Sequence, residues 1–296
     1  MMREAQTVLA LDIGGTKMLA ALVRGETVVD SLKVPTPRDM GGPAQWLEAL
    51  FAQIEHWKGA YGCVGVAVTG IVDDGLWSPL NRRTLDFPDR FPLLETVGAL
   101  SGVSAIAAND AQAAAWGEYR FGEAEGNLVF LTVSTGIGGG IVMDGRLRTG
   151  LAGHFGLLRG QDFEGAGGDD SALEDHVSGN FIAASAAAHQ PGATSHDVFD
   201  AAAMGEGWAN DIIDRSARRV AILCRNIQLS FDPDRIVIGG GIGLAPGYRA
   251  RIEAQLDHVS ERLKPRLAAA RLGERAGVVG IADLALQNTT QNQVKQ

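Results

Sequence analysis

The chain of 296 residues has only two cysteines and no long hydrophobic run. Cys63 and Cys224 lie in apolar segments far apart in the sequence, which favours two buried free thiols in a reducing compartment; a disulfide is the alternative. No apolar run approaches the roughly 18 residues that cross a bilayer. The first residues have no signal-peptide pattern, because a strand pattern starts almost at once. We therefore expect a cytoplasmic protein with no membrane partner.

The chain is also short of basic residues. Lys and Arg number 26 against 35 Asp and Glu, which gives a formal net charge of −9 and a pI of about 5.2. This balance disfavours nucleic acid as the main partner. A Gly-x-x-x-x-Gly-Lys-Ser/Thr phosphate loop is missing, and the run Gly239–Gly243 lacks the Gly-x-Gly-x-x-Gly spacing of dinucleotide-binding folds. The sequence therefore excludes a P-loop protein and disfavours a Rossmann enzyme.

Glycine, by contrast, is abundant and clustered. Three glycine-rich loops follow the predicted buried strands 8–13, 127–133 and 235–238. Because such loops carry no side chains, a ligand can approach their backbone N–H groups, and concave N–H arrays of this kind bind phosphate. The first two loops have the same strand–turn–strand layout, which indicates an internal repeat. The length of the chain predicts two domains of roughly 100–180 residues each.

Two aspartates lie at the ends of predicted strands. A strand pattern at 103–108 ends in Asn109-Asp110, and an alanine-rich helical pattern follows at 110–121. Either residue can cap that helix by accepting one of its first backbone N–H groups. The alternative is that Asp110, at a strand end where ligand crevices form, is a general base. Asp12 occupies the same position on the first strand, as a turn-forming residue or as an oxygen ligand of Mg²⁺.

Four segments together resemble the ROK family (repressors, open reading frames and kinases). They are Leu-Asp-Ile-Gly-Gly-Thr-Lys, Asn-Asp-Ala-Gln-Ala-Ala-Ala-Trp, Val-Ser-Thr-Gly-Ile-Gly-Gly-Gly and Gly-Leu-Ala-Gly-His, and the resemblance runs from residue 8 to about 287. It implies an α/β protein with an actin-like, hexokinase-type (ribonuclease H-like) fold, two domains around a cleft, and a homodimer. We expect one domain at 1–110 plus about 280–296, and the other at 111–279.

The activity that the resemblance implies is ATP-dependent phosphorylation of the 6-hydroxyl of an amino sugar, with N-acetylmannosamine as the favoured substrate and Mg²⁺ as the metal. Glucose and N-acetylglucosamine are alternative substrates within the family, and a sugar-binding regulator without catalysis is a further alternative. A repressor is disfavoured, because the helix-turn-helix segment of such members precedes the first strand, which begins here near residue 8.

The resemblance also implies residue roles. Asp110 is expected to be the catalytic base that takes the proton of the sugar hydroxyl. The residues expected to bind the sugar are Asn81, Asn109, Asp110, His154 and Glu174. The residues expected to bind ATP are Asp12, Gly14, Gly15, Thr16, Lys17, Thr135, Gly136, Gly138, Gly240 and Gly241, with Asp12 as a possible ligand of Mg²⁺.

One family feature is missing. Most members carry a structural zinc site made of a His and a Cys-x-Cys-Gly-x-x-Gly-Cys run ahead of the glutamate that matches Glu174. Counted back from Glu174, the four ligand places fall on Leu157, Gly165, Gly167 and Ala172. None of these side chains binds zinc. The sequence therefore predicts a protein without structural zinc.

Overall fold

A computed structural model describes residues 6–82, 84–122, 126–159 and 172–294, without the side chains of 291–294. The chain forms two compact units. Unit 1 holds Met1–Phe121, Thr149–Leu151 and Glu274–Gln296, and unit 2 holds Gly122–Arg148 and Ala152–Gly273. The sequence placed the first boundary at 110/111, whereas the structure assigns the whole helix 110–121 to unit 1.

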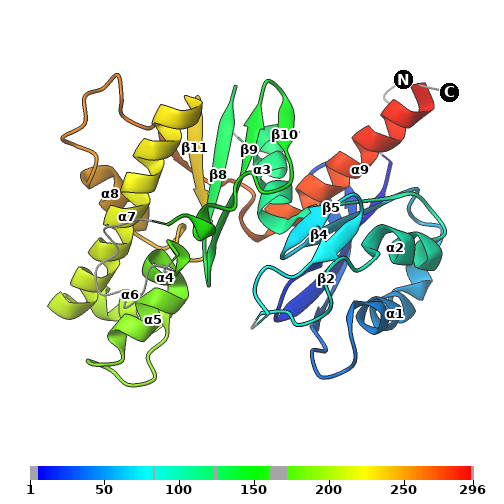
Figure 1. Cartoon of the computed structure of the whole chain (residues 1–296), viewed down its shortest axis with the longest axis horizontal. Coiled ribbons are helices and arrows are strands. Elements are labelled where there is room, and N and C mark those ends of the chain that lie inside the picture. Colours follow the sequence, from blue (N-terminus) through cyan, green and yellow to red (C-terminus); the bar gives the residue numbers. More distant parts are fainter. Residues whose placement is uncertain (1–5, 83, 123–125, 160–171, 295–296) are drawn as a thin grey trace. The chain divides into compact units, whose positions relative to one another are not determined.

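Unit 1 is built on a mixed five-stranded sheet in the order β3-β2-β1-β4-β7, in which β1, β4 and β7 are parallel and β2 and β3 are antiparallel (Figure 1). Its strands are β1 (Val8–Ile13), β2 (Lys17–Arg24), β3 (Thr27–Pro35), β4 (Val64–Val68) and β7 (Ala105–Asn109), with a separate hairpin of β5 (Ile71–Asp73) and β6 (Leu76–Ser78). Its helices are α1 (Pro43–Gln53), α2 (Leu93–Ser101), α3 (Asp110–Phe121) and α9 (Ala276–Val294), with the 3₁₀ turn Glu55–Trp57.

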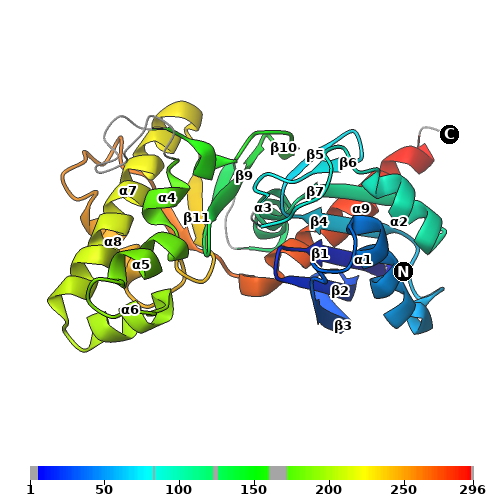
Figure 2. The same ribbon diagram turned by 60° about the horizontal axis from the view of Figure 1, so that its bottom comes forward.

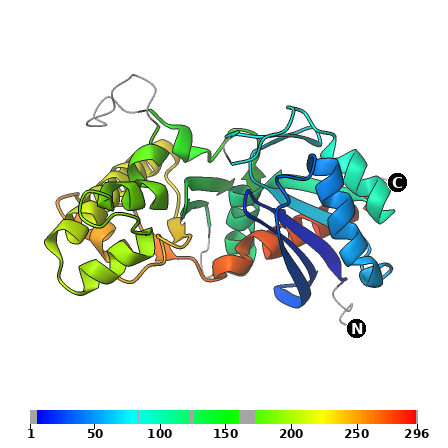
Figure 3. The same cartoon turned by 90° about the horizontal axis from the view of Figure 1, so that it is seen from below.

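The two faces of this sheet carry side chains of different size. Leu9, Leu11 and Ile13 point to one face and pack in a core with residues of α1. The other face is lined by small residues, and a Cβ on Gly65 would contact the carbonyl oxygen of Ile281 in α9 at 2.5 Å. Figure 3 shows the blue strands between the blue helix α1 and the orange-red start of α9. Small residues therefore let α9 approach the strand backbone closely.

Helices α3 and α9 approach each other in the same way. A Cβ on Gly280 would collide with the carbonyl oxygen of Ala113. A Cβ on Gly117 would lie 2.5 Å from the carbonyl oxygen of Ala276. At one edge of this contact, the Trp116 Nε1–H donates to Asp283 at 2.8 Å. This packing explains why α3 belongs to unit 1.

Unit 2 repeats the layout of unit 1. Its sheet has the order β10-β9-β8-β11-β12, again with three parallel strands (β8, β11 and β12) and two antiparallel ones. Its strands are β8 (Leu128–Val133), β9 (Ile137–Met143), β10 (Arg146–Arg148), β11 (Arg235–Gly239) and β12 (Leu267–Ala269). Strand β8 begins at residue 128 and β1 at residue 8, which is an offset of 120. The predicted internal repeat is therefore present in both strand order and direction.

The helices of unit 2 pack on one another and on this sheet (Figure 2). They are α4 (Glu174–Val177), α5 (Gly179–Ala186), α6 (Ser195–Ala203), α7 (Gly207–Phe231) and α8 (Tyr248–Ala254), with the 3₁₀ turns Phe155–Leu157 and Gly273–Arg275 in the connections of the chain. Along α7 the buried positions include Ile213, Val220 and Ile227, which form one apolar face in the core of the unit.

Some predicted boundaries were wrong. The sequence pattern over residues 173–188 predicts one helix, but the structure splits this segment into α4 and α5, because Ser178 is extended and its hydroxyl accepts the backbone N–H of Phe181 as the cap of α5. The amphipathic pattern over residues 248–263 predicts one helix, but α8 ends at Ala254. The polar composition beyond Gln287 predicts a frayed tail, but α9 continues as far as Val294. None of the helices in the described ranges is both long and apolar enough to cross a membrane.

Candidate functional site

Unit 1 brings together two of the predicted carboxylates. Asp12 lies near the carboxyl end of β1, and Asp110 follows β7 at the first position of α3. The pKa of Asp12 is raised to about 7, chiefly by burial and in addition by the charge of Asp110, while Lys17 acts in the opposite direction. Gly277, near the start of α9, lies next to this pair, since a Cβ there would be 3.7 Å from Oδ2 of Asp12. The ends of the parallel strands thus hold two neighbouring acids.

The Asp110 carboxylate is held in place by its neighbours. Its Oδ2 accepts a hydrogen bond from the Thr69 hydroxyl at 2.8 Å, and its Oδ1 accepts the backbone N–H of Ala111 at 2.8 Å. The backbone of Thr69 is fixed in turn, because its carbonyl oxygen accepts Trp77 Nε1–H at 3.0 Å and its N–H donates to Ile13. The carboxylate therefore has a defined orientation.

Asn109 is the cap of helix α3. Its Oδ1 accepts the backbone N–H groups of Ala111 at 3.0 Å and Gln112 at 3.3 Å, while its Nδ2 donates to the carbonyl oxygen of Gly70 at 3.0 Å. Asn109 therefore has the helix-capping role that was one of the two alternatives for the Asn109-Asp110 pair. An amide nitrogen carries two hydrogens, so Nδ2 has a second one with which to reach a ligand.

The first glycine loop is a tight turn between β1 and β2. The N–H of Gly14 donates to the carbonyl oxygen of Lys17 at 3.0 Å, and the Thr36 hydroxyl donates to the carbonyl oxygen of Gly14 at 2.7 Å. Gly15 lies against Thr84, because a Cβ at Gly15 would be 3.0 Å from the Thr84 carbonyl oxygen. Thr16 and Lys17 are exposed beyond it.

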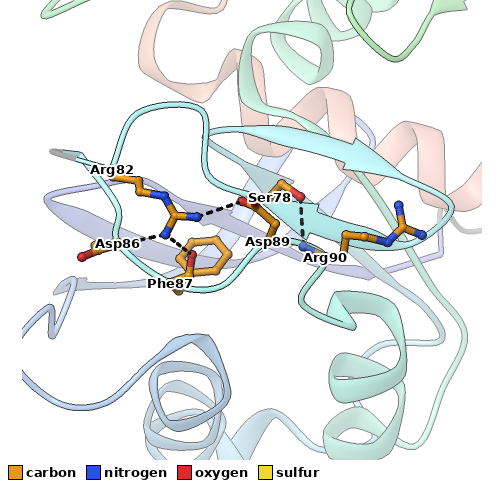
Figure 4. A network of polar contacts seen from close by, with 6 residues as sticks. All are labelled: Ser78, Arg82, Asp86, Phe87, Asp89 and Arg90. Atoms are coloured by element: carbon orange, nitrogen blue, oxygen red, sulfur yellow. Dashed lines mark hydrogen bonds and ion pairs between the residues drawn. The ribbon is translucent and has the colours of Figure 1, made fainter.

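The loop that carries Asn81 is pinned from both sides. The carbonyl oxygen of Asn81 accepts the N–H groups of Thr84 and Leu85, and the side chain of Leu85 is buried in the core. On the outer side, Arg82 donates to Asp86, to Asp89 and to the carbonyl oxygen of Phe87, and the Ser78 hydroxyl accepts the N–H of Arg90 (Figure 4). Asn81 itself is exposed.

In unit 2 the second glycine loop, Ser134–Ile137, lies against α4 and α5. The Ile137 N–H donates to Oε2 of Glu174 at 3.0 Å, and the Gly179 N–H donates to the carbonyl oxygen of Ser134 at 2.7 Å. A Cβ on Gly136 would collide with the Glu174 carboxylate, so a side chain at this position would displace that carboxylate. The structure thus brings Thr135, Gly136 and Glu174 together, and Gly138 continues into β9.

The third glycine loop is fixed to the same turn region. Gly240 has φ +85°, and a Cβ there would collide with the carbonyl oxygen of Val133. That oxygen accepts the N–H groups of Ile242 and Gly243 at 3.0 Å. Gly241 has open space around its Cβ direction. The second and third loops are therefore neighbours at the ends of the parallel strands β8 and β11.

Among the described residues, His154 has a side chain whose buried nitrogens lack a hydrogen-bond partner. Both ring nitrogens are buried, and neither has a hydrogen-bond partner among the residues that the structure describes. Leaving a buried polar atom unpaired costs about 1–3 kcal/mol. Gly156, two residues on, approaches Glu174, since a Cβ there would be 3.4 Å from its Oε2. A ligand with hydroxyl groups would satisfy the imidazole.

A pocket of about 910 Å³ opens within unit 2 beside Thr135 and Gly241. Its apolar wall includes Phe199, Ile213 and Leu244, and its lining residues are Ser134, Thr135, Gly179, Asn180, Ala183, Ala193, Thr194, Ser195, His196, Phe199, Asp200, Ala202, Ala203, Ile213, Gly241, Ile242, Leu244, Ala245, Pro246 and Arg251. Of these lining residues, only Thr135 and Gly241 in the glycine loops are predicted from the sequence to bind ATP. The rest lies on helices whose apolar positions look like ordinary core.

Within the described ranges, no three His, Cys, Asp or Glu side chains come close enough together to hold a metal ion. Of the four places of the family zinc site, Leu157 is 44 % exposed and Ala172 forms an isolated bridge with Arg159. Gly165 and Gly167 lie outside the described residues. The absence of structural zinc stays a prediction.

The chain is similar to known proteins over almost its whole length. The model described as ROK family matches residues 8–288. The bifunctional enzyme NanE/NanK of Brucella melitensis biotype 1 is 44% identical over 284 residues, which are 96% of this chain and 54% of that enzyme. The chain therefore spans about half the length of this relative. The N-acetylmannosamine kinase of Escherichia coli O127:H6 is 40% identical over 286 residues, 94% of this chain and 98% of that kinase.

A solved structure supports the fold. The ROK family glucokinase of Streptomyces griseus, in complex with glucose and AMPPNP, is 30% identical, with a TM-score of 0.78 over 95% of this chain and 99% of that one. Together with the two repeated mixed sheets, this similarity confirms the actin-like α/β fold that the sequence predicted.

Proposed function

Because the chain belongs to the ROK family, we propose that it transfers the γ-phosphoryl group of ATP to the 6-hydroxyl of N-acetylmannosamine. The kinase of Escherichia coli supports this substrate, since it is matched over 98% of its own length. The observation that carries the proposal is the position of the Asp110 carboxylate. It lies at the end of the parallel strands, is oriented by the Thr69 hydroxyl, and is close enough to Asp12 to raise the pKa of that residue.

Asp110 is the base in this reaction. The sugar O6 attacks the γ-phosphorus, an O6–P bond forms as the bond to the bridging oxygen of ADP breaks, and the hydroxyl proton passes to the carboxylate. The transition state of phosphoryl transfer is loose, so catalysis depends mainly on position and on charge neutralisation. A fixed carboxylate is sufficient for the proton, which leaves late. The Thr69 hydroxyl and the Ala111 N–H, which donate to Asp110, keep its carboxylate oriented.

The pocket of unit 2 suits the nucleotide. Its apolar wall of Phe199, Ile213 and Leu244 matches a flat base, and the Thr135 and Gly241 loops at its edge match phosphate oxygens. The turn Gly14–Lys17 of unit 1 is the second phosphate-binding element of the proposal. In it, Lys17 contributes a positive charge.

Asp12 fits a hard cation that accompanies the phosphates. Burial and the charge of Asp110 disfavour a bare carboxylate at this position, as the raised pKa records. Oxygen ligands of this kind suit Mg²⁺, and Asp12 would hold it directly or through water. When bound, Mg²⁺ neutralises charge on the phosphates.

The sugar hydroxyls pair with His154, Glu174 and the second amide hydrogen of Asn109 in this proposal. His154 has two buried ring nitrogens without a partner in the described part of the chain, so it is organised for a ligand. Oε2 of Glu174 accepts the Ile137 N–H, and Oε1 would accept a hydrogen bond from a sugar hydroxyl. Asn81, on its pinned loop, is the outermost residue of the set.

The test is steady-state kinetics of the purified chain with ATP and a panel of sugars. We expect kcat/KM for N-acetylmannosamine to exceed the values for N-acetylglucosamine and glucose by about tenfold or more, the range that a single lost polar contact supports. A preference for glucose would show that N-acetylmannosamine is the wrong substrate, while the chain would still be a sugar kinase. Absence of any sugar-dependent ADP release would favour the non-catalytic, sugar-binding regulator.

Two further expectations belong to this proposal. Elemental analysis of the purified chain is expected to find far less than one zinc per chain, because Leu157 and Ala172 stand at two of the ligand places; one equivalent of zinc would refute it. The homodimer implied by the family is checked by light scattering.

A further inference from the structure

The turn Ser134–Ile137, which is proposed above to bind phosphate and is called the phosphate turn below, is hydrogen-bonded to one short segment, residues 174–180. Besides the bonds of Glu174 to Ile137 and of Gly179 to Ser134, the Asn180 N–H donates to the carbonyl oxygen of Thr135 at 3.3 Å. The same segment therefore contacts the turn at three successive points. Its position determines both the shape of the turn and the direction of the Glu174 carboxylate.

This segment cannot be rigid by itself. Helix α4 has four residues, and Ser178 interrupts it before α5 begins. Isolated helices much shorter than about 12 residues do not form stably in water. What holds α4 must therefore come from elsewhere in unit 2.

Helix α7 supplies the first anchor through Ser216. The Ser216 hydroxyl lies 2.7 Å from the carbonyl oxygen of Val177 and 2.7 Å from the hydroxyl oxygen of Tyr248. A carbonyl oxygen can only accept, so Ser216 donates its one proton to Val177 and Tyr248 donates to Ser216. All three residues are fully buried. If Ser216 lost its hydroxyl, the buried carbonyl oxygen of Val177 would not be reached by solvent water in its place.

Arg219, one helical turn along α7, is the second anchor. Its guanidinium donates to the carbonyl oxygen of His176 at 3.1 Å and lies 5.7 Å from the centre of the Phe181 ring. His176 belongs to α4 and Phe181 to α5, so Arg219 joins the two short helices. Burial lowers the pKa of His176, and the charge of Arg219 lowers it further, which keeps a second positive charge away from this contact.

We propose that Ser216 and Arg219 are positioning residues, which act through α4 and α5 to hold the phosphate turn and Glu174 in the geometry that binds ATP and sugar. The proposal rests on the proposed function for its ligands. It assigns to hydrogen bonds from α7 the clamping role that a metal site has in most of the family. Neither residue touches a substrate in this scheme.

The experiment compares Ser216→Ala, Arg219→Met and Tyr248→Phe with the parent chain. The KM for ATP and the KM for sugar are expected to rise together in Ser216→Ala and Arg219→Met, by about tenfold, the size of one lost buried hydrogen bond. Tyr248→Phe is expected to have a smaller effect, because Ser216 keeps its bond to Val177. Ser216→Thr, which retains the hydroxyl, should restore the affinities in part.

Ile227→Val is the matched control. Ile227 lies on the same helix, about three turns beyond Ser216, and is 2 % exposed. Its replacement is expected to lower stability by about 0.5–1.5 kcal/mol. A merely structural role of Ser216 and Arg219 predicts that all variants lose stability alike and that both KM values stay at the parent level. That outcome would overturn the proposal.

Amide exchange of the free protein separates this proposal from the proposed function. Peptides that cover residues 134–141 should exchange faster in Ser216→Ala and Arg219→Met than in Ile227→Val. Equal exchange in all three would refute the anchor even if the enzyme phosphorylates its sugar. If the parent phosphorylates no sugar at all, the proposed function fails, and the exchange rates still decide whether α7 holds the turn. Arg219→Met, on a partly exposed position, keeps the test open if Ser216→Ala does not fold.

Discussion

Thr69 and Asp110 are joined by a hydrogen bond of 2.8 Å, in which the threonine hydroxyl donates to the carboxylate oxygen Oδ2. The bond links the end of β4 to the start of α3 and fixes the direction of the proposed base. The Thr69 carbonyl oxygen is itself held by Trp77. The hydroxyl therefore orients the carboxylate from a rigid support, and the two residues make separable contributions to catalysis.

Replacing Asp110 by Asn is expected to lower kcat by about 10²–10⁴-fold, because the amide cannot accept the proton. Thr69→Val removes only the orienting donor, and we expect a loss of about tenfold in kcat, in line with one neutral hydrogen bond. The sugar affinity of both variants, measured by calorimetry, should stay close to that of the parent. Full turnover by Asp110→Asn would remove this residue from the mechanism.

Asp12 makes the stability of the free protein depend on pH. Its pKa is about 7 in the folded chain, above the ordinary value of 3.8. Between these two values the folded state keeps a proton that the unfolded state has released, so stability falls as pH rises through this window and levels off above about pH 7. Asp12→Asn abolishes the effect. Its gain in Tm over the parent, measured in EDTA, should grow from about pH 4 to about pH 8.

A gain that is the same at every pH would contradict this account of Asp12. Asp39→Asn is the control, because it removes the same charge from an exposed position. The same Asp12→Asn protein is expected to bind MgATP more weakly.

His154→Phe is expected to separate binding from stability. The phenyl ring keeps the shape of the side chain and removes two buried nitrogens that lack protein partners in the described residues. Without ligand, Tm should therefore stay the same or rise, while the KM for sugar rises by about tenfold. A fall in Tm with an unchanged KM would indicate that the imidazole is a structural residue.

Gly280→Ala tests the contact of α3 with α9. The new methyl group would collide with the Ala113 carbonyl oxygen, and the overpacking should cost about 1–3 kcal/mol of unfolding free energy. Gly98→Ala, in helix α2, is the matched control, because a Cβ there meets nothing within 4 Å. It should stabilise the chain by about 0.5–1 kcal/mol. Chemical denaturation measures the unfolding free energy of both variants, which should fall in Gly280→Ala and rise in Gly98→Ala.

The long repeated strands could be predicted because their signal is local. Val8–Ile13 and Leu128–Val133 are mostly apolar runs followed by glycine-rich turns, and both are strands in the structure. Helix α2 and strand β12 were missed. Helix α2 contains Gly98 and depends on the burial of Leu93 and Val97, and β12 has three residues that pair with β11 alone. Elements this short are determined by their tertiary contacts.

The candidate site likewise has features with a local sequence signal and features that depend on tertiary contacts. The glycine loops and Asp110 are sequence-local signals, and the structure gives them the positions expected at the strand ends. The bond from Ile137 to Glu174 joins residues 37 apart and depends on how α4 packs on α7. No spacing in the sequence encodes it. The wall of the pocket around Phe199 is likewise a product of helix packing.

The assignment of α9 to unit 1 has a consequence for biosynthesis. The ribosome makes the first 121 residues, then all of unit 2, and only afterwards Ala276–Val294. Until that last helix emerges, one side of the N-terminal sheet, at Gly65 and its neighbours, has no cover. Unit 2 can complete its interior earlier, since its segments are translated almost without interruption. The half of the protein that is made first is therefore the half that matures last.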